Sequence, residues 1–314
     1  MKKENQKTKT EIVEDLPFSE YQSRPGINNS SLHDIDGDRR DAGCPAKFHF
    51  NHVLGMKDQS NSDSEPLRFG RALHSYVLTR EEFDKEYIVE DEELYQRILS
   101  EANAEQIEQG RKPSTKFSKN LGAWKAFKAS IAGTGKELLS ADAFETIQHM
   151  NRSVSDPVQA LDPRTAEVLN SNLKTELSLF AQLDDGRGNL IDCKARLDAI
   201  DLEGGVIYDL KSLGEWNPGN SIAQWAWWMQ AAFYCDLTKA CGVCDDPRFG
   251  WIFVKKSPPY ESQLHFAERE LLKAGRIKYR QHLQQIHDCR ESGKWGGHRP
   301  VMYPRWLQEI IDNI

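Results

Sequence analysis

Two aspartates and a lysine are the residues of this sequence whose types and spacing best suit chemistry on a charged substrate. They lie between Arg196 and Leu213, in two apolar-rich runs that flank Gly204 and Gly205. Two-residue hairpin loops need backbone conformations with positive φ, which glycine adopts without strain, so the segment predicts a β-hairpin. In this hairpin Glu203 is expected to pair with Val206.

This register predicts that the polar side chains converge. Counting outward from the turn, Asp198 is expected opposite Lys211, and Ile200 opposite Asp209. Directly opposed Cβ atoms lie roughly 5 Å apart and diagonal ones about 7–8 Å. Because side chains alternate along a strand, four polar residues share one face: Arg196, Asp198, Asp209 and Lys211. A three-residue turn would place Asp209 on the other face.

Paired carboxylates beside a lysine are typical of magnesium-dependent phosphoryl transfer. Two carboxylates at short range resist joint ionisation unless a cation lies between them. Mg²⁺ uses such carboxylates together with water and substrate phosphate, and it activates water and neutralises phosphoryl charge. A nearby lysine orients the nucleophile or stabilises the transition state. The hairpin alone favours the plainer alternative, a surface hairpin with a cross-strand Asp–Lys pair, so the rest of the chain must decide.

The composition is that of a globular protein with an acidic charge balance. The 314 residues, 39% hydrophobic and 28% charged, allow one large domain or two small ones. The net charge of −7 argues against non-specific coating of nucleic acid but not against a nuclease. No run approaches the ~20 apolar residues of a membrane span, and no apolar signal core is present. We therefore expect a cytoplasmic protein without a membrane partner.

The cysteines fit a reducing compartment better than a disulfide framework. They are Cys44, Cys193, Cys235, Cys241, Cys244 and Cys289. Cys241 and Cys244 form a single CxxC, and no second short cluster supplies the further ligands that zinc or an iron–sulfur cluster would need. We interpret all six as reduced cysteines.

Periodicity along the chain predicts the elements that position the hairpin. Residues 1–25 are polar and aperiodic and predict a flexible arm, which leaves residues 26–314 as a single domain. Strands are expected at 175–183, 190–200, 248–255 and 260–266. Helices are expected near 29–35, 45–54, 67–78, 142–155, 222–239 and 268–289.

Several polar residues stand out on these elements. His74 lies beside the apolar side of its helix, where a histidine is usually structural. Gln230 and Tyr234 share a face of an aromatic-rich helix, and a buried amide needs partners. Glu176 begins a strand on the face opposite its apolar row.

Residues 111–128 contain six basic side chains and no acid. Four of the lysines are candidates for contacts with a DNA backbone: Lys112, Lys116, Lys119 and Lys125. Phe117, Trp124 and Phe127 interleave with them, as in single-strand-binding segments. The equally weighted alternative is a solvated helix face whose aromatic rings turn to the core.

Taken in order, these motifs resemble the PD-(D/E)XK nuclease superfamily, in particular its RecE-type (exodeoxyribonuclease VIII-like) branch from phages and prophages. The resemblance covers roughly residues 26–297 and rests on short motifs: Asn29–Leu32, Cys44–Phe48, Gly70–His74, Glu176–Phe180, Asp198, Asp209–Lys211, Gln230 and Tyr234. It implies an α/β restriction-endonuclease-like core, a central mixed sheet flanked by helices, with N-terminal helical additions. Two departures are Leu197, where the superfamily name implies proline, and Asp209, which replaces glutamate.

The resemblance also implies roles for residues. His74, Asp198 and Asp209 would bind Mg²⁺, with Mn²⁺ as a substitute. Lys211 would position or activate the attacking water. Gln230 and Tyr234 would orient the site or contact the DNA backbone, and Glu176 would be a further ligand or an orienting acid.

The function implied is Mg²⁺-dependent 5′→3′ digestion of double-stranded DNA ends, leaving 3′ single strands for an annealing recombinase. The branch further implies a ring-like homo-oligomer in a bacterial or phage-infected cell. One alternative is an endonuclease or CRISPR-associated-type nuclease of the same superfamily, whose iron–sulfur members need a cysteine cluster that Cys289 alone does not supply. The other is a non-catalytic DNA-binding recombination scaffold.

Overall fold

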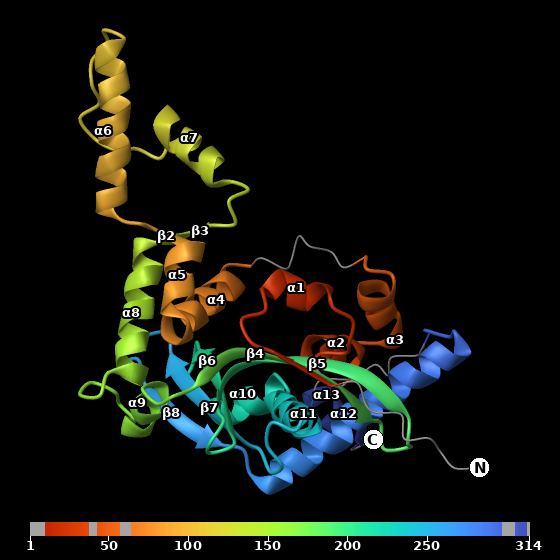
Figure 1. Ribbon diagram of the computed structural model, residues 1–314. Helices are drawn as coiled ribbons and strands as arrows, with labels where there is room; N and C mark the ends of the chain where they lie inside the picture. The colour runs from red at the N-terminus through yellow and green to blue at the C-terminus, as the bar shows by residue number, and fades with distance from the viewer. Residues whose placement is uncertain (1–9, 38–42, 57–63, 297–304, 313–314) are drawn as a thin grey trace.

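A six-stranded mixed sheet with helices on both faces forms the centre of the molecule (Figure 1). The computed structural model describes residues 10–37, 43–56, 64–296 and 305–312. The strands lie in the order β1 (Glu11–Val13), β4 (Lys174–Asp184), β5 (Leu190–Asp201), β6 (Val206–Leu213), β7 (Arg248–Lys255) and β8 (Ser262–Phe266). This confirms the predicted α/β class and the central mixed sheet.

The strand connections follow the predicted succession. β4, β5 and β6 are consecutive antiparallel neighbours. A crossover through α10 (Pro218–Gln224) and α11 (Trp227–Ala240) then makes β7 parallel to β6, and β8 returns antiparallel. Parallel neighbours need such a crossover, so the sheet changes direction next to the helix that carries Gln230 and Tyr234.

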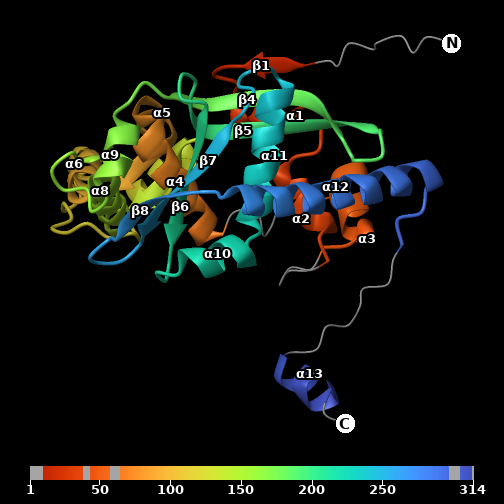
Figure 2. The ribbon, with the colours of Figure 1, turned by 90° about the horizontal axis from the view of Figure 1, so that it is seen from below.

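Helices cover the two faces of the sheet and bury two cores. α11 and α12 (Arg269–Ser292) pack with β4 and β5 in the first core, and α12 is the long helix of Figure 2. α4 (Glu65–Leu78) and α8 (Ala141–Ser155) pack with β6, β7 and β8 in the second. α11 and α12 approach closely at Gly275, where a Cβ would lie 2.5 Å from the carbonyl oxygen of Trp228.

The turn of the central hairpin differs from the predicted one. β5 and β6 pair through Asp201 and Val206, so four residues form the loop instead of two. The side chain of Asp201 accounts for this, because its Oδ1 accepts hydrogen bonds from the backbone N–H groups of Glu203 at 3.0 Å and Gly204 at 2.9 Å. Gly205 supplies the positive φ of 63°. The predicted pairing of Glu203 with Val206 was therefore wrong.

The predicted helix over residues 222–239 is two helices. Ala226 has φ 52° and ψ 35°, a left-handed conformation that ends α10. Its carbonyl oxygen accepts hydrogen bonds from the backbone N–H groups of Met229 and Gln230, at 3.0 and 3.2 Å, and so starts α11. Because alanine rarely adopts this conformation, hydrophobic periodicity alone did not reveal the break.

The N-terminal segment is ordered where a flexible arm was predicted. Residues 1–9 lie outside the described residues, but β1 pairs with β4 and α1 (Phe18–Ser23) packs beside it. Lys194 of β5 holds the end of α1 by donating hydrogen bonds to the carbonyl oxygens of Tyr21 at 2.8 Å, Gln22 at 3.1 Å and Arg24. The polar composition concealed these long-range contacts.

An arm projects from the body between residues 87 and 140 (Figure 1). Its base is a parallel ribbon of β2 (Tyr87–Glu90) and β3 (Glu137–Ser140). α6 (Glu92–Glu108) and α7 (Gly122–Ile131) form the arm and bury Trp124 between them. The arm therefore has a small core of its own.

The predicted N-terminal helical additions are present as α2 (Asn29–Ile35), α3 (Pro45–Phe48) and the π-helix η1 (His49–Val53). The remaining helices are α5 (Arg80–Glu86), α9 (Pro163–Leu169) and α13 (Arg305–Asp312). Within the described ranges, every helix is too short or too polar to cross a membrane.

Candidate active site

The candidate site lies where the sheet divides. β5 and β6 are paired only next to the turn, from Ala199 to Asp201. Farther from the turn the two strands separate, and β5 pairs with β4 while β6 pairs with β7. Asp198 is the first residue beyond the last pair on β5, and Asp209 is its counterpart on β6. The predicted opposition of Asp198 and Lys211 was thus wrong by two positions. A shift of two preserves the face of each side chain, so the carboxylates still converge.

Asp198 replaces a missing backbone hydrogen bond at this division. Its Oδ2 accepts a hydrogen bond from the backbone N–H of Leu210 at 3.1 Å and lies 3.0 Å from Nε2 of His74. Burial favours the neutral acid, but His74, Lys211 and the Leu210 N–H together hold the pKa of Asp198 below its ordinary value. One carboxylate therefore joins α4, β5 and β6.

His74 is oriented by its own helix. Its Nδ1 lies 2.7 Å from the carbonyl oxygen of Gly70, one helical turn earlier, which requires a proton on Nδ1. In the neutral ring Nε2 is then the free nitrogen and faces Asp198, as in metal sites where a backbone carbonyl fixes the tautomer. Burial lowers the pKa of His74, but the charge and hydrogen bond of Asp198 outweigh it and raise the pKa to about 9.

Asp209 is a buried carboxylate with a hydrogen-bond donor on one oxygen and an ion-pair partner on the other. Its Oδ1 accepts a hydrogen bond from Nε2 of Gln230 at 2.9 Å, and Nζ of Lys211 lies 2.6 Å from Oδ2. Although this ion pair is close, Oδ2 has no regular hydrogen bond within the described part of the chain. Burial and the charge of Asp198 raise the pKa of Asp209 to about 6, against the effect of Lys211. The single ammonium beside this oxygen therefore does not offset its burial and the nearby charge of Asp198.

The first turn of α11 completes this side of the site. Nζ of Lys211 lies 5.4 Å from the ring centroid of Trp227, which has the range of a cation–π contact. Tyr234 lies one turn after Gln230, and burial raises its pKa well above the ordinary value, so its hydroxyl keeps its proton. The left-handed Ala226 sets the direction of this turn. Trp227 and Ala226 were not predicted as site residues.

Glu176 flanks the cluster from β4. The pairs on either side, Thr175 with Ala199 and Leu177 with Leu197, place it across from Asp198. Its φ of 54° is unusual in a strand, and its carboxylate pairs with Arg196. Burial and the charge of Asp198 raise the pKa of Glu176, against the effect of Arg196. The structure brings Glu176 next to the site but turns it toward an arginine.

The basic segment lies apart from this cluster, on the projecting arm. Its four candidate lysines are exposed: Lys112, Lys116, Lys119 and Lys125. Lys119 forms an ion pair with Glu90 and lies 5.8 Å from the centroid of the buried Trp124 ring. Phe117 and Phe127 pack around the same ring, at 5.5 and 5.6 Å. The aromatic side chains therefore belong to the core of the arm, as the structural alternative predicted.

The cluster fits a divalent metal by the chemistry of its donors. An imidazole Nε2 and two carboxylates are available from His74, Asp198 and Asp209. A cation would offset the burial and the repulsion from Asp198 that raise the pKa of Asp209. Within the described ranges, no three His, Cys, Asp or Glu side chains already surround a common point. The reason is visible in the contacts, since His74 and Lys211 lie against the carboxylate oxygens that would ligate the ion.

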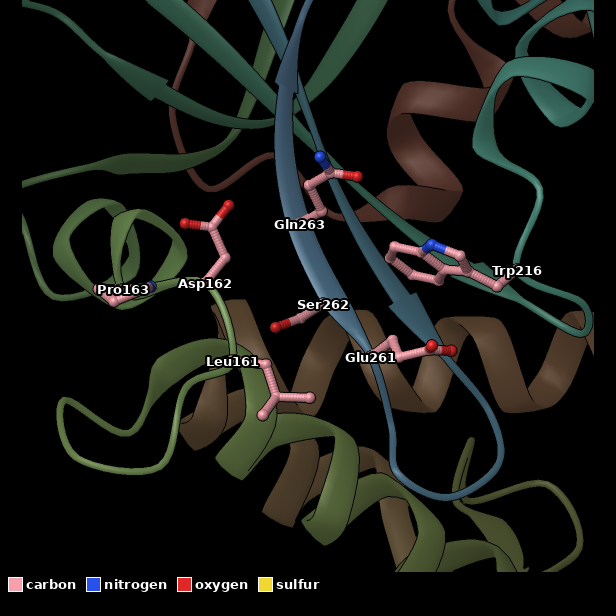
Figure 3. Close-up of a pocket in the computed structure, with 7 residues that line it drawn as sticks. All are labelled: Leu161, Asp162, Pro163, Trp216, Glu261, Ser262 and Gln263. Carbon is pink, nitrogen blue, oxygen red and sulfur yellow. The ribbon is translucent and has the colours of Figure 1, made fainter.

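A cavity of about 350 Å³ lies elsewhere, between the loop before α9 and the start of β8 (Figure 3). The lining residue Asp162 already has hydrogen-bond partners. Its Oδ2 accepts hydrogen bonds from the backbone N–H of Leu264 at 2.9 Å and from the Arg164 guanidinium at 2.7 Å. Ser262 donates to the carbonyl oxygen of Ser153 at 2.7 Å. The polar groups of this cavity thus hold α8, α9 and β8 together, and none belongs to the cluster at the division of the sheet.

Comparison with known proteins agrees with this fold. The model of the PD-(D/E)XK nuclease superfamily matches residues 41–294. The structure is similar to the crystal structure of a putative exonuclease from Eubacterium rectale, with a TM-score of 0.55 and 13% sequence identity, covering 96% of this chain and all of the other. At that identity the likeness concerns the fold. No curated protein matches the sequence.

Proposed function

Because the chain belongs to the PD-(D/E)XK nuclease superfamily, we propose that it hydrolyses phosphodiester bonds of DNA, working as an exonuclease from double-stranded ends. The observation that carries the proposal is the pairing of two carboxylates, the half-buried Asp198 and the buried Asp209, with Lys211 at the division of the sheet. The fold it shares with a putative exonuclease and the RecE-type motifs support action at ends.

In this proposal His74, Asp198 and Asp209 hold a divalent cation, Mg²⁺ or Mn²⁺ in its place. When bound, the cation polarises the phosphoryl group and neutralises its charge. Gln230 keeps Asp209 oriented through the 2.9 Å hydrogen bond, and His74 is held by the carbonyl oxygen of Gly70. These fixed side chains give the preorganisation that phosphoryl transfer requires.

Lys211 acts on the attacking water and on the phosphoryl group. Its ammonium is restrained between Asp209 and the Trp227 ring, so it donates hydrogen bonds from a fixed position. Donation to the water orients an oxygen lone pair toward phosphorus, and donation to a phosphoryl oxygen offsets developing charge. Tyr234 supplies a further hydroxyl donor, and Glu176, across from Asp198 on β4, serves as a further ligand or an orienting acid.

Further parts of the proposal rest on the RecE-type motifs alone. They are 5′→3′ polarity, release of 3′ single strands to an annealing recombinase, and assembly into a homo-oligomer. For the arm, we propose that Lys112, Lys116, Lys119 and Lys125 contact the DNA backbone, which their exposure supports.

The proposal is tested with linear duplex DNA labelled at either the 5′ or the 3′ end, incubated with Mg²⁺, Mn²⁺ or EDTA, beside a covalently closed circle. Metal-dependent release of the 5′-terminal nucleotide with an intact circle is the expected result. Cleavage of the circle would instead indicate an endonuclease. Binding of DNA without any cleavage would support the non-catalytic scaffold.

A further inference from the structure

Phe18 is an exposed aromatic ring held at the edge of the catalytic cluster. Its neighbours Leu16 and Tyr21 are 4% and 6% exposed, whereas Phe18 is 52% exposed. The Phe18 ring stacks on Tyr21, with a centroid distance of 6.3 Å and an interplanar angle of 19°. One side of the ring is therefore supported by the protein, while much of its surface is left to solvent.

A set of contacts leads from this ring to Glu176, which neighbours the carboxylate cluster. The guanidinium carbon of Arg196 lies 5.7 Å from the Phe18 centroid. The same guanidinium binds the carboxylate of Glu176 and the carbonyl oxygen of Leu16. Glu176 in turn lies across from Asp198. Two side chains, Arg196 and Glu176, thus link Phe18 to the neighbourhood of Asp198, a residue proposed to bind the metal.

The backbone that carries Phe18 is fixed at both ends. Before it, β1 pairs with β4 from Glu11 to Val13. After it, the ammonium of Lys194 is bound by three carbonyl oxygens at the end of α1. Binding of a ligand to the ring would therefore cost little conformational entropy, because this segment is already ordered.

From this arrangement we propose that Phe18 is a stacking platform for the terminal base of the DNA strand being degraded, which rests on the proposed function. Aromatic faces bind bases without sequence preference, and a neighbouring arginine adds favourable charge. The aromatic rings of the arm do not compete for this role, because Trp124 is 1% exposed and the others pack around it. Phe18 combines exposure, a supported ring and proximity to the acids.

The test uses the full-length protein with Phe18→Leu, Phe18→Ala and Phe18→Tyr. Leucine keeps apolar bulk but has no aromatic face, and tyrosine keeps the face. Phe266→Ala is the matched control, since Phe266 is 39% exposed at the end of β8. One readout is kcat/KM on linear duplex DNA. The second is the fluorescence of 2-aminopurine at the strand terminus, measured during binding in EDTA.

We expect Phe18→Leu and Phe18→Ala to lower kcat/KM about 5- to 100-fold and to abolish quenching of 2-aminopurine. Phe18→Tyr should retain both, and Phe266→Ala should match the unaltered protein. Equal values for Phe18→Leu and Phe266→Ala in both readouts would overturn the inference. If the unaltered protein cleaves no DNA, the proposed function fails, whereas the fluorescence readout still decides whether a terminal base stacks on Phe18.

Discussion

At the scale of single residues, the two aspartates have opposite electrostatic environments. Asp198 receives a backbone N–H and faces His74, and its pKa is lowered. Asp209 is 1% exposed, and burial with the charge of Asp198 raises its pKa to about 6. The first carboxylate stabilises the local fold, and the second is held ionised at some cost in stability.

Asp209→Asn should therefore stabilise the metal-free protein at neutral pH. Because folding raises the pKa of Asp209, ionisation costs stability as the pH rises from about 4 through 6. Asparagine avoids this cost, so its free energy of unfolding in EDTA should exceed that of the unaltered protein by about 1–3 kcal/mol above pH 7. The difference should vanish below about pH 4. Urea unfolding across this pH range measures the difference in the free energy of unfolding between the variant and the unaltered protein. If the variant gained less stability over the unaltered protein at pH 8 than at pH 4, the raised pKa of Asp209 would be contradicted.

Lys211→Met separates catalysis from metal binding. Loss of the ammonium should lower hydrolysis by at least about 100-fold, because the neutral Tyr234 hydroxyl does not supply the positive charge that offsets the developing phosphoryl charge. Affinity for Mn²⁺ should be kept or increased, since Lys211 competes for Oδ2 of Asp209. Calorimetric titration beside a nuclease assay tests both. Lys255→Met, which removes an ion pair with Glu261 at 3.4 Å, is the control. Loss of both metal binding and hydrolysis would contradict a direct role of Lys211 in hydrolysis and would indicate that it only positions Asp209.

At the scale of elements, the sequence predicted what depends on local pattern. Alternation identified β4 and β5, and the Gly204–Gly205 pair located the hairpin. The register was missed because Asp201 hydrogen-bonds two backbone N–H groups and lengthens the turn. The break at Ala226 was missed because tertiary packing imposes a conformation that alanine disfavours. The cluster itself survived both errors, since a two-residue shift keeps side chains on the same face.

The ordered N-terminal segment was missed for a different reason. β1 and α1 are held by partners about 170 residues away, such as Lys194, which no local pattern records. The candidate metal ligands were found because their types and order match short motifs of a family. Trp227 was not found, because one tryptophan among several in an aromatic helix carries no distinguishing signal.

Two helical glycines give a matched test of the α11–α12 contact. Gly275→Ala would place a Cβ 2.5 Å from the Trp228 oxygen and 2.6 Å from Cβ of Ala232. The clash should destabilise the protein by about 1–3 kcal/mol. Gly70→Ala meets no atom within 4 Å and should stabilise α4 by about 0.5–1 kcal/mol through helix propensity. Urea midpoints measure both, and equal effects would show that the helix contact is looser than described.

At the scale of the whole molecule, the acidic chain carries its exposed basic segment away from the acids. Replacing Lys112, Lys116 and Lys125 by alanine should reduce the slope of log affinity against log salt for DNA by about 2–3, with kcat unchanged. Lys119 is left in place because it pairs with Glu90. The control is a triple alanine variant of three exposed lysines outside the arm, Lys239, Lys273 and Lys294. An equal slope in both variants would remove the arm from the DNA interface.

The hydrogen bond from Leu210 to Asp198 also bears on how this fold would change over evolution. A descendant that lost catalysis would still need an acceptor for that N–H, so selection for folding alone would retain Asp198. Lys211 satisfies no backbone group by any contact described above, and it would be free to drift once hydrolysis no longer mattered. Among relatives of this chain, the lysine is therefore the better marker of an active enzyme, and the first aspartate is a marker of the fold.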